Sequence, residues 1–169
     1  MKPFLLCTFL VCFLFPVASC MQEQDTAAPP STEVPGVLAM IPDFSLQDLS
    51  GATRFLKDYR GKTVLINFTT TWCPYCTREI PSLKNMYSSF NARGFELIAI
   101  YVNESREKVT SFTSKNDLPW TVLLDSDGTV AKMFGVTGVP TKFLVKKDGS
   151  IACGPCVNVD TRIDELLKE

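Results

Sequence analysis

The sequence predicts an α/β domain, with a central mixed β-sheet flanked by helices, over residues 41–169. Apolar, β-branched runs at 63–68 and 95–102 are typical of strands that are covered on both faces. Helical periodicity follows the first run, and a hairpin turning at 147–149 and a closing helix end the chain. Strands that alternate with helices and then give way to a hairpin indicate this class of fold.

Each element has its own pattern. Phe44, Leu46 and Leu49 alternate around a turn at 48–51, which predicts a short N-terminal hairpin. After Cys73, apolar residues recur at helical spacing as far as Phe90. The remaining elements are expected at 105–116 (a helix capped by Ser105), 121–124 (a strand), 129–134 (a short helix), 141–145 (a strand), Ile151 onward (a strand) and 161–168 (a helix capped by Asp160).

Residues 1–19 predict an export signal. Lys2 precedes an almost unbroken apolar run that is short for a membrane span. The run ends in Val17-Ala18-Ser19-Cys20, which resembles the bacterial lipobox, in which the cysteine is lipidated. We therefore expect a lipoprotein-type signal peptide, a lipid on Cys20, and an extracytoplasmic, membrane-anchored protein on the periplasmic side. Plain secretion and an uncleaved anchor are the alternatives.

Residues 20–40 predict the lipidated cysteine followed by a flexible linker. The segment is rich in Gln, Glu, Thr, Ala, Pro and Ser, and has too few apolar residues to form a core. The rest of the chain has the size of one domain with a single core, and we expect a monomer. The formal net charge is −1 without a basic cluster, so nucleic acid is not an expected partner.

The chain has seven cysteines and no histidine, so the candidate catalytic residues are cysteines. Four of them lie in the predicted domain as two CxxC pairs, Cys73/Cys76 and Cys153/Cys156. Such short loops gain little stability from chain entropy when bridged, so the spacing favours redox chemistry over structural bridging. A four-cysteine zinc site is the alternative, but the two pairs are far apart in sequence and no histidine could complete a mixed site. We expect no metal.

The first pair follows a buried strand and opens a helix. Cys73 is expected at the helix N-terminus, where unpaired N–H groups and the helix dipole stabilise a thiolate. Pro74 suits the first helical turn because its missing N–H costs nothing there. We assign Cys73 as the nucleophile and Cys76 as the resolving, more buried thiol.

Several motifs together resemble the TlpA/ResA group of membrane-anchored thiol–disulfide oxidoreductases, which are thioredoxin-like and related to the redoxin and AhpC/TSA proteins. The resemblance covers about residues 41–169 and implies a thioredoxin-like fold with an N-terminal β-hairpin extension. It rests on Thr71-Trp72-Cys73-Pro74-Tyr75-Cys76, Glu79-Ile80-Pro81, Pro42-Asp43-Phe44-Ser45-Leu46, Asp125-Ser126-Asp127-Gly128, Phe134-Gly135-Val136 and Gly138-Val139-Pro140-Thr141.

The resemblance also assigns roles around the dithiol. Pro140 is implied to be a cis-proline that faces the two cysteines and presents the Val139 backbone to an extended polypeptide. A trans turn proline is the alternative. The residues implied to bind substrate are Trp72, Pro74, Tyr75, Val139 and Thr141.

Two positions bear on proton transfer. The general thioredoxin pattern has a buried acid six residues before the first cysteine, where this chain has Asn67, so that role is vacant. Glu79 matches an acidic position of the TlpA/ResA pattern, and an unpaired buried carboxylate there would suit proton shuttling. The alternative is a solvated glutamate paired with Arg78 or Lys84.

The second pair, Cys153-Gly154-Pro155-Cys156, departs from the family pattern. It precedes the expected final helix by several residues, so no helix N-terminus activates it. Bonding of its two sulfurs requires a bend at Gly154-Pro155, because residues three apart on a regular strand are too distant. A second redox pair or relay, a structural disulfide and two separate buried thiols all remain open.

The expected activity is thiol–disulfide exchange of the protein-disulfide reductase type, with no cofactor beyond the redox-active Cys73–Cys76 disulfide. The resemblance implies protein thiol and disulfide substrates, apocytochrome c among them for cytochrome c biogenesis, and a membrane thiol transporter as electron donor. A peroxiredoxin-like thiol peroxidase is one alternative, because Thr70-Thr71-Trp72-Cys73 fits part of that pattern. A metal-binding thiol module is the other.

Overall fold

The structure is a computed structural model that describes residues 42–169. The expected signal peptide at 1–19, the expected lipidation site Cys20 and the expected linker at 20–40 lie outside the described residues. Among those that are described, no helix combines the length and the hydrophobicity that crossing a membrane requires.

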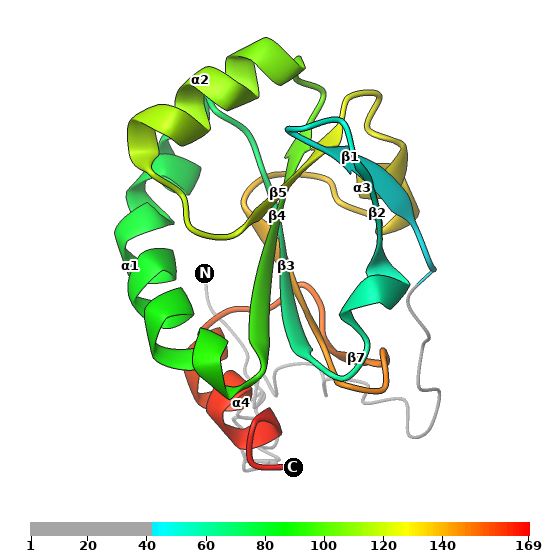
Figure 1. Cartoon of the computed structure of the whole chain (residues 1–169), viewed down its shortest axis with the longest axis vertical. Coiled ribbons are helices and arrows are strands. Elements are labelled where there is room, and N and C mark those ends of the chain that lie inside the picture. Colours follow the sequence, from blue (N-terminus) through cyan, green and yellow to red (C-terminus); the bar gives the residue numbers. More distant parts are fainter. Residues whose placement is uncertain (1–41) are drawn as a thin grey trace, which may run out of the picture. The chain divides into compact units, whose positions relative to one another are not determined.

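Seven strands form one mixed sheet in the order β2-β1-β5-β4-β3-β6-β7 (Figure 1). The strands β3, β4 and β5 are parallel to one another, and the other pairings are antiparallel. The strands are β1 (Ser45–Asp48), β2 (Thr53–Phe55), β3 (Thr63–Thr69), β4 (Phe95–Val102), β5 (Thr121–Asp125), β6 (Thr141–Val145) and β7 (Ile151–Cys153). The prediction of an α/β domain with a central mixed sheet is confirmed.

Helices cover both faces of this sheet (Figure 1). The helices are α1 (Pro74–Phe90), α2 (Arg106–Asn116), α3 (Thr129–Met133) and α4 (Val159–Leu166). One apolar cluster joins α1, α2 and α4 to the sheet, with Leu83, Val109 and Ile163 among its buried members. A second cluster, which includes Phe68 and Val130, lies on the opposite face with α3. Each face of the sheet is therefore buried, as the apolar strand sequences predict.

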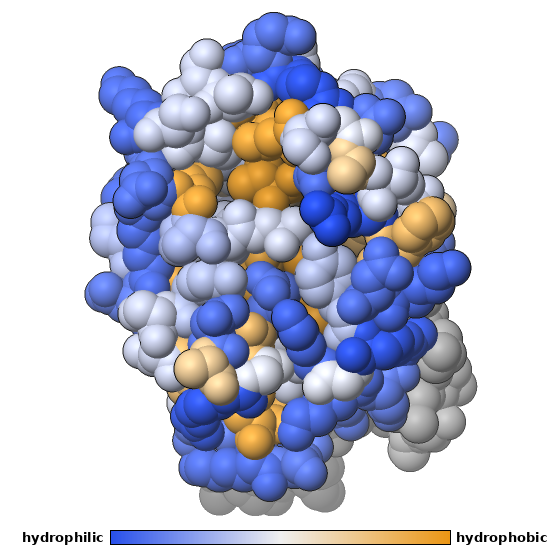
Figure 2. Space-filling view, viewed as in Figure 1, coloured by the Kyte–Doolittle hydropathy of each residue, from blue (hydrophilic) through white to orange (hydrophobic). Residues whose placement is uncertain are grey.

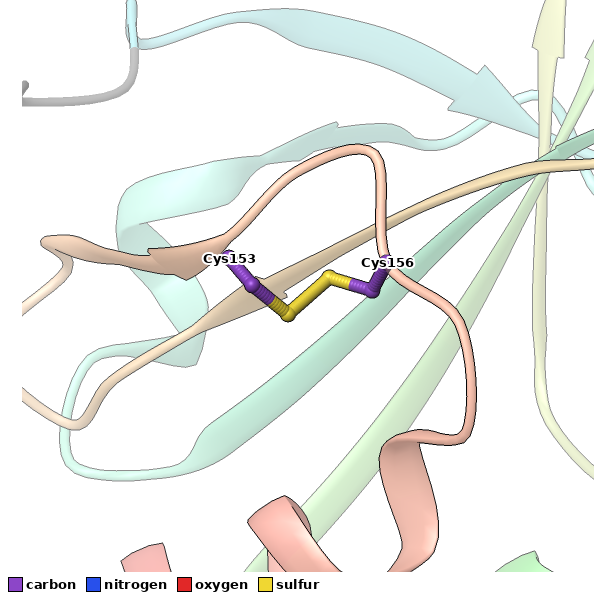
Figure 3. The surroundings of a disulfide bond; sticks show 2 residues. All are labelled: Cys153 and Cys156. Carbon is purple, nitrogen blue, oxygen red and sulfur yellow. A yellow bond between two sulfur atoms is a disulfide. The ribbon is translucent and has the colours of Figure 1, made fainter. Parts of the chain in front are cut away.

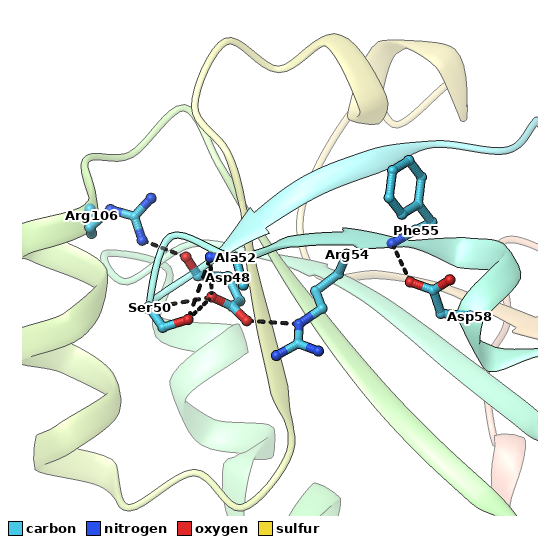
Figure 4. A network of polar contacts seen from close by, with 7 residues as sticks. All are labelled: Asp48, Ser50, Ala52, Arg54, Phe55, Asp58 and Arg106. Atoms are coloured by element: carbon cyan, nitrogen blue, oxygen red, sulfur yellow. Dashed lines mark hydrogen bonds and ion pairs between the residues drawn. The ribbon is translucent and has the colours of Figure 1, made fainter.

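The predicted N-terminal hairpin is formed by β1 and β2, and a polar network closes its turn (Figure 4). The Asp48 carboxylate accepts hydrogen bonds from the backbone and hydroxyl of Ser50, from the Ala52 amide and from Arg54. Arg106, in α2, donates to the Asp48 carbonyl. The hydrogen bond from the Ser50 hydroxyl is the main cause that lowers the pKa of Asp48 to about 2. This network ties the hairpin to α2.

The start of the last helix differs from the prediction. The helix α4 begins at Val159, and its N-cap is Asn158, which has a positive φ of 53° and makes no side-chain cap hydrogen bond. Asp160 is therefore a first-turn residue, where its negative charge suits the helix dipole, and the prediction that it caps the helix is wrong. Ser105 does cap α2, accepting from the Lys108 amide.

Candidate active site

The strand β3 delivers the first cysteine pair to the start of α1. All seven residues of β3 are buried, and the chain then turns so that Cys73 becomes the N-cap of α1 and Pro74 its first residue. The Cys73 sulfur accepts a hydrogen bond from the Cys76 amide at 3.2 Å. The sulfur thus occupies the position of a capping side chain, as predicted, and a thiolate there would receive an N–H at the positive end of the helix dipole.

The loop before β6 lies against the same sulfur. The Cys73 thiol donates to the Val139 carbonyl, with the sulfur and oxygen 3.7 Å apart, although 66 positions separate the two residues in sequence. The Val139–Pro140 peptide bond is cis, as predicted. Thr141 begins β6, and its hydroxyl donates to the Gly138 carbonyl at 2.6 Å. The fold therefore brings the dithiol and the proline loop together.

Both thiols of the first pair are buried and free. Cys73 and Cys76 are each 4% exposed, so the prediction that Cys76 is the more buried of the two is wrong. Burial, and next the hydrogen bond with Cys73, raise the pKa of Cys76 to about 11, although hydrogen bonds with Thr69 and Thr70 act in the opposite direction. Cys76 therefore rests as a thiol, which suits a sulfur that acts second.

Two aromatic side chains flank the dithiol on the outside. Trp72 is 66% exposed and Tyr75 is 67% exposed, and both adjoin the cysteines in sequence. The Arg78 guanidinium lies over the Tyr75 ring, 4.8 Å from its centroid. Large apolar groups at such exposure are available to contact another polypeptide.

Glu79 is held between two strands. Its Oε2 lies 2.5 Å from Lys142 Nζ, in β6, and its Oε1 accepts from Asn67 Nδ2, in β3, at 3.0 Å. The alternative that Glu79 is solvated and paired with Arg78 or Lys84 is therefore wrong. The expectation of an unpaired buried carboxylate is wrong as well. Asn67, which cannot replace the missing acid, instead positions Glu79. Sequence reasoning missed Lys142 because nothing local pairs it with a residue on α1.

Glu104 is a second residue that the sequence analysis missed. Its carboxylate, which is 1% exposed, accepts from the Thr71 amide at 2.7 Å and the Thr71 hydroxyl at 2.6 Å, and pairs with Lys108. The parallel strands β3 and β4 end at the same edge, with Thr69 opposite Tyr101. The sequence did contain a signal for this contact, because Glu104 is a polar residue just past the end of β4. Residues at such positions lie near the loop that follows the neighbouring parallel strand, here the loop after β3.

The second cysteine pair is a disulfide (Figure 3). The Cys153 and Cys156 Cα atoms are 5.6 Å apart, and the chain bends between them at Gly154-Pro155, as bonding requires. A side chain at Gly154 would meet the Phe143 ring, since an added Cβ would lie 2.0 Å from Phe143 Cδ1. The expectation of two separate thiols is therefore wrong for this pair.

A groove joins the proline loop to this disulfide. It has a volume of about 360 Å³ and is lined by Glu79, Pro140, Lys142, Cys156 and Asp160, among others. The Cys156 amide also donates to the Lys142 carbonyl at 2.8 Å. Cys156 of the disulfide and Pro140 of the proline loop thus line the same groove.

A larger cavity lies away from the two cysteine pairs. It has a volume of about 750 Å³ and is lined by Leu49, Leu118 and Trp120, together with polar residues of the hairpin turn and α2. Figure 2 shows a hydrophobic hollow next to α2 on an otherwise largely hydrophilic face. None of the described cysteines lines this cavity, so the chemistry is not located there. Residues 42–169 contain no group of three or more His, Cys, Asp and Glu side chains placed to hold a metal ion.

Comparison with known proteins agrees with this geometry. The model of the AhpC/TSA family matches residues 37–153. Thiol-disulfide oxidoreductase ResA from Bacillus thuringiensis is 38% identical over 110 residues, which are 65% of this chain and 64% of that protein. ResA from Bacillus subtilis is 36% identical, over 65% of this chain and 62% of that protein. The matches therefore span just under two thirds of the length of these curated relatives.

Solved structures share the fold. A thiol:disulfide interchange protein of the thioredoxin family from Chlorobium tepidum superposes with a TM-score of 0.66 at 26% identity, over 75% of this chain and 94% of that one. The chain thus has a thioredoxin-like α/β fold, matches the family model over most of its length, and resembles the ResA proteins in the segment that carries the cysteines. It belongs to the AhpC/TSA family.

Proposed function

We propose that this protein is a thiol–disulfide oxidoreductase that exchanges electrons with cysteines of other polypeptides through Cys73 and Cys76. The observation that carries the proposal is the position of Cys73. Its sulfur receives the Cys76 amide at a helix N-terminus and lies 3.7 Å from the Val139 carbonyl, next to the cis-proline. An extended polypeptide beside Val139 would therefore pass within reach of the attacking sulfur.

The chemistry runs in two steps. The Cys73 thiolate attacks a substrate disulfide, forming a mixed disulfide and releasing one substrate thiol. Cys76 then attacks the Cys73 sulfur, closing the Cys73–Cys76 disulfide and releasing the second substrate thiol. The protein is oxidised and the substrate reduced, and a donor dithiol restores the starting state. No cofactor other than the disulfide takes part.

A turnover assay tests this activity. Wild type, Cys73→Ser and Cys153→Ser/Cys156→Ser are compared in the reduction of insulin disulfides, with a small dithiol as donor. We expect wild type to accelerate the reaction and Cys73→Ser to lose the acceleration. Turnover that is independent of Cys73 would overturn the proposal.

A thiol peroxidase is the second candidate, supported by the match to the AhpC/TSA family model. The same donor is assayed with hydrogen peroxide in place of insulin. Faster consumption of peroxide than of protein disulfide would favour the peroxidase. We expect the opposite, because a second cysteine one turn after Cys73 is built to resolve a mixed disulfide.

The substrate and the location form the finer part of the proposal. We propose an extracytoplasmic protein, held to the membrane by a lipid on Cys20, that reduces disulfides in proteins such as apocytochrome c and takes electrons from a membrane thiol transporter. The support is the Val17-Ala18-Ser19-Cys20 motif together with the similarity to ResA proteins. Membrane fractionation of wild type and Cys20→Ala tests the anchor. We expect only Cys20→Ala to appear in the soluble fraction, and an unmodified N-terminus downstream of Cys20 would contradict the anchor.

A further inference from the structure

A small cavity lies next to Cys76 inside the domain. Its volume is about 10 Å³, which is room for about one water molecule. Cys76 lines it together with Asn67, Thr69, Tyr101 and Trp120, and apolar side chains form the rest of the wall. The cavity is therefore in contact with the thiol that must act in the resolving step.

Two polar atoms of the residues around the cavity are unpaired. Asn67 Oδ1 and Trp120 Nε1 are buried and have no hydrogen-bond partner among residues 42–169. Asn67 is 3% exposed and Trp120 is 7% exposed. The Asn67 amide is already oriented, because its Nδ2 donates to Glu79. Leaving a buried donor or acceptor unmatched is destabilising, so buried polar groups in native proteins nearly always have a partner.

One water molecule would satisfy both atoms. It would accept a hydrogen bond from Trp120 Nε1–H and donate one to Asn67 Oδ1, which leaves one lone pair and one O–H for a third partner. A buried water needs two to four polar partners, and the Cys76 sulfur is on the same wall. The remaining lone pair can accept from a thiol, and the remaining O–H can donate to a thiolate.

We propose that this cavity is a binding site for one ordered water molecule, held by Trp120 and Asn67, that hydrogen-bonds the Cys76 sulfur and stabilises its thiolate in the resolving step. The proposal rests on the proposed function. In that step the Cys76 thiolate forms a bond to the Cys73 sulfur, the bond from Cys73 to the substrate sulfur breaks, and the released substrate thiolate takes up the proton that Cys76 has lost. Trp120 and Asn67 act as positioning residues.

A thiolate at Cys76 could also be stabilised by the other ionisable groups near it. Cys73 lies on the same helix turn, Tyr101 faces the cavity from β4, and the Glu79–Lys142 pair lies beyond Asn67. Burial is the main cause that raises the pKa of Tyr101, and Glu104 adds to it, so Tyr101 offers no charge at neutral pH. Beside the hydrogen bonds with Thr69 and Thr70, a neutral donor held in the cavity is therefore a further way to stabilise the Cys76 thiolate inside the domain.

The first test uses the unaltered protein. In water-selective NMR, the Trp120 indole N–H is expected to show a cross-peak to water with the sign of a long-lived bound molecule. The other tryptophan, Trp72, is largely exposed and serves as the internal control for exchange with bulk solvent. A Trp120 indole without a bound-water cross-peak would mean that the site is dry and the proposal wrong.

The second test measures the chemistry. The mixed disulfide is formed on Cys73, and its resolution by Cys76 is followed against pH in wild type and Trp120→Phe. We expect resolution to slow about tenfold at neutral pH and the midpoint of the profile to rise by about one unit, since one pKa unit is a tenfold change. The control is Tyr87→Phe, because Tyr87 packs edge-on against Trp120 without lining the cavity.

The two proposals fail in different ways. Equal rates and equal midpoints in wild type and Trp120→Phe would overturn the water site and leave the oxidoreductase activity intact. A wild type that forms no mixed disulfide would overturn the activity, and the NMR measurement would still decide whether the water is bound. A shift in Tyr87→Phe as large as in Trp120→Phe would assign the effect to core packing and contradict the water.

Discussion

Lys142 and Glu79 form an ion pair in the groove, with Nζ 2.5 Å from Oε2, although one lies on β6 and the other on α1. Both residues line the groove with Pro140, and the Lys142 carbonyl accepts from the Cys156 amide. Lys142 therefore connects the carboxylate near the dithiol to the second disulfide. Any proton transfer by Glu79 must occur with this lysine in contact.

A double-mutant cycle measures that contact. Lys142→Met leaves a part-buried carboxylate with only its Asn67 hydrogen bond, and we expect it to lower the free energy of unfolding by about 1–2 kcal/mol. In the Glu79→Gln background the same change should cost about 1 kcal/mol less, because no charge is left unpaired. Denaturant unfolding at neutral pH provides the numbers. Lys84→Met is the matched control, and a coupling energy near zero would contradict the pair.

The Asp48 network predicts a loss of stability in acid. The folded-state pKa of about 2 lies below the ordinary value of 3.8, so the ionised carboxylate stabilises the fold above pH 4 and this contribution disappears as the pH falls from about 4 to 2. We expect Asp48→Asn to be less stable than wild type by about 1 kcal/mol at neutral pH. The difference should vanish near pH 2. A difference that stays constant between pH 5 and pH 2 would show that the charge plays no part.

The Cys76 thiol predicts the opposite dependence at high pH. Its pKa is raised from 9.0 to about 11, so the folded state favours the thiol, and the stability that this gives is complete below pH 9 and lost as the pH rises to 11. The Cys76 ¹³Cβ chemical shift in the reduced protein should titrate near pH 11. Resolution of a mixed disulfide should accelerate about tenfold per pH unit below that value. Titration of Cys76 near neutral pH would contradict the assignment of its role.

Local pattern predicted much of the fold. The apolar runs of β3 and β4, the alternation in the hairpin and the Ser105 cap are properties of short segments, and the structure contains each of them. The cis peptide bond before Pro140 could be predicted because the motif around it is specific to a family. The start of α4 could not, because Asn158 caps it through backbone conformation and makes no side-chain contact.

The contacts that set the chemistry were harder to predict. Lys142 pairs with Glu79 only because β6 lies next to β3 and opposite α1, and a single sequence does not give that register. The hydrogen bonds between Glu104 and Thr71 form only because β3 and β4 are neighbours and end at the same edge of the sheet. Asn67 was predicted only to leave the role of the buried acid vacant. Its hydrogen bond to Glu79 could not be predicted, because the sequence does not show in which direction its amide points.

The disulfide between Cys153 and Cys156 is the basis of a prediction that the two cysteine pairs exchange electrons. We predict that Cys153–Cys156 exchanges with Cys73/Cys76, since both the disulfide and Pro140 border the same groove. Cys153→Ser/Cys156→Ser should then change the turnover and the reduction potential of the first pair, besides losing at most about 2 kcal/mol of stability, as expected for so short a loop. Trapping Cys73 in a disulfide with Cys153 or Cys156, in a Cys76→Ser background, would establish exchange. Unchanged turnover and potential would leave the pair a structural role only.

The role of Cys73 as the attacking sulfur is tested most directly by identifying the sulfur that first bonds to substrate. Reduced Cys76→Ser and reduced Cys73→Ser are each mixed with a disulfide-bonded polypeptide, and peptide mass spectrometry locates the mixed disulfide. We expect a stable adduct on Cys73 in Cys76→Ser, because the Cys73 sulfur is the helix N-cap and no resolving thiol remains. We expect no adduct on Cys76 in Cys73→Ser. An adduct that forms faster on Cys76 than on Cys73 would contradict the role of Cys73.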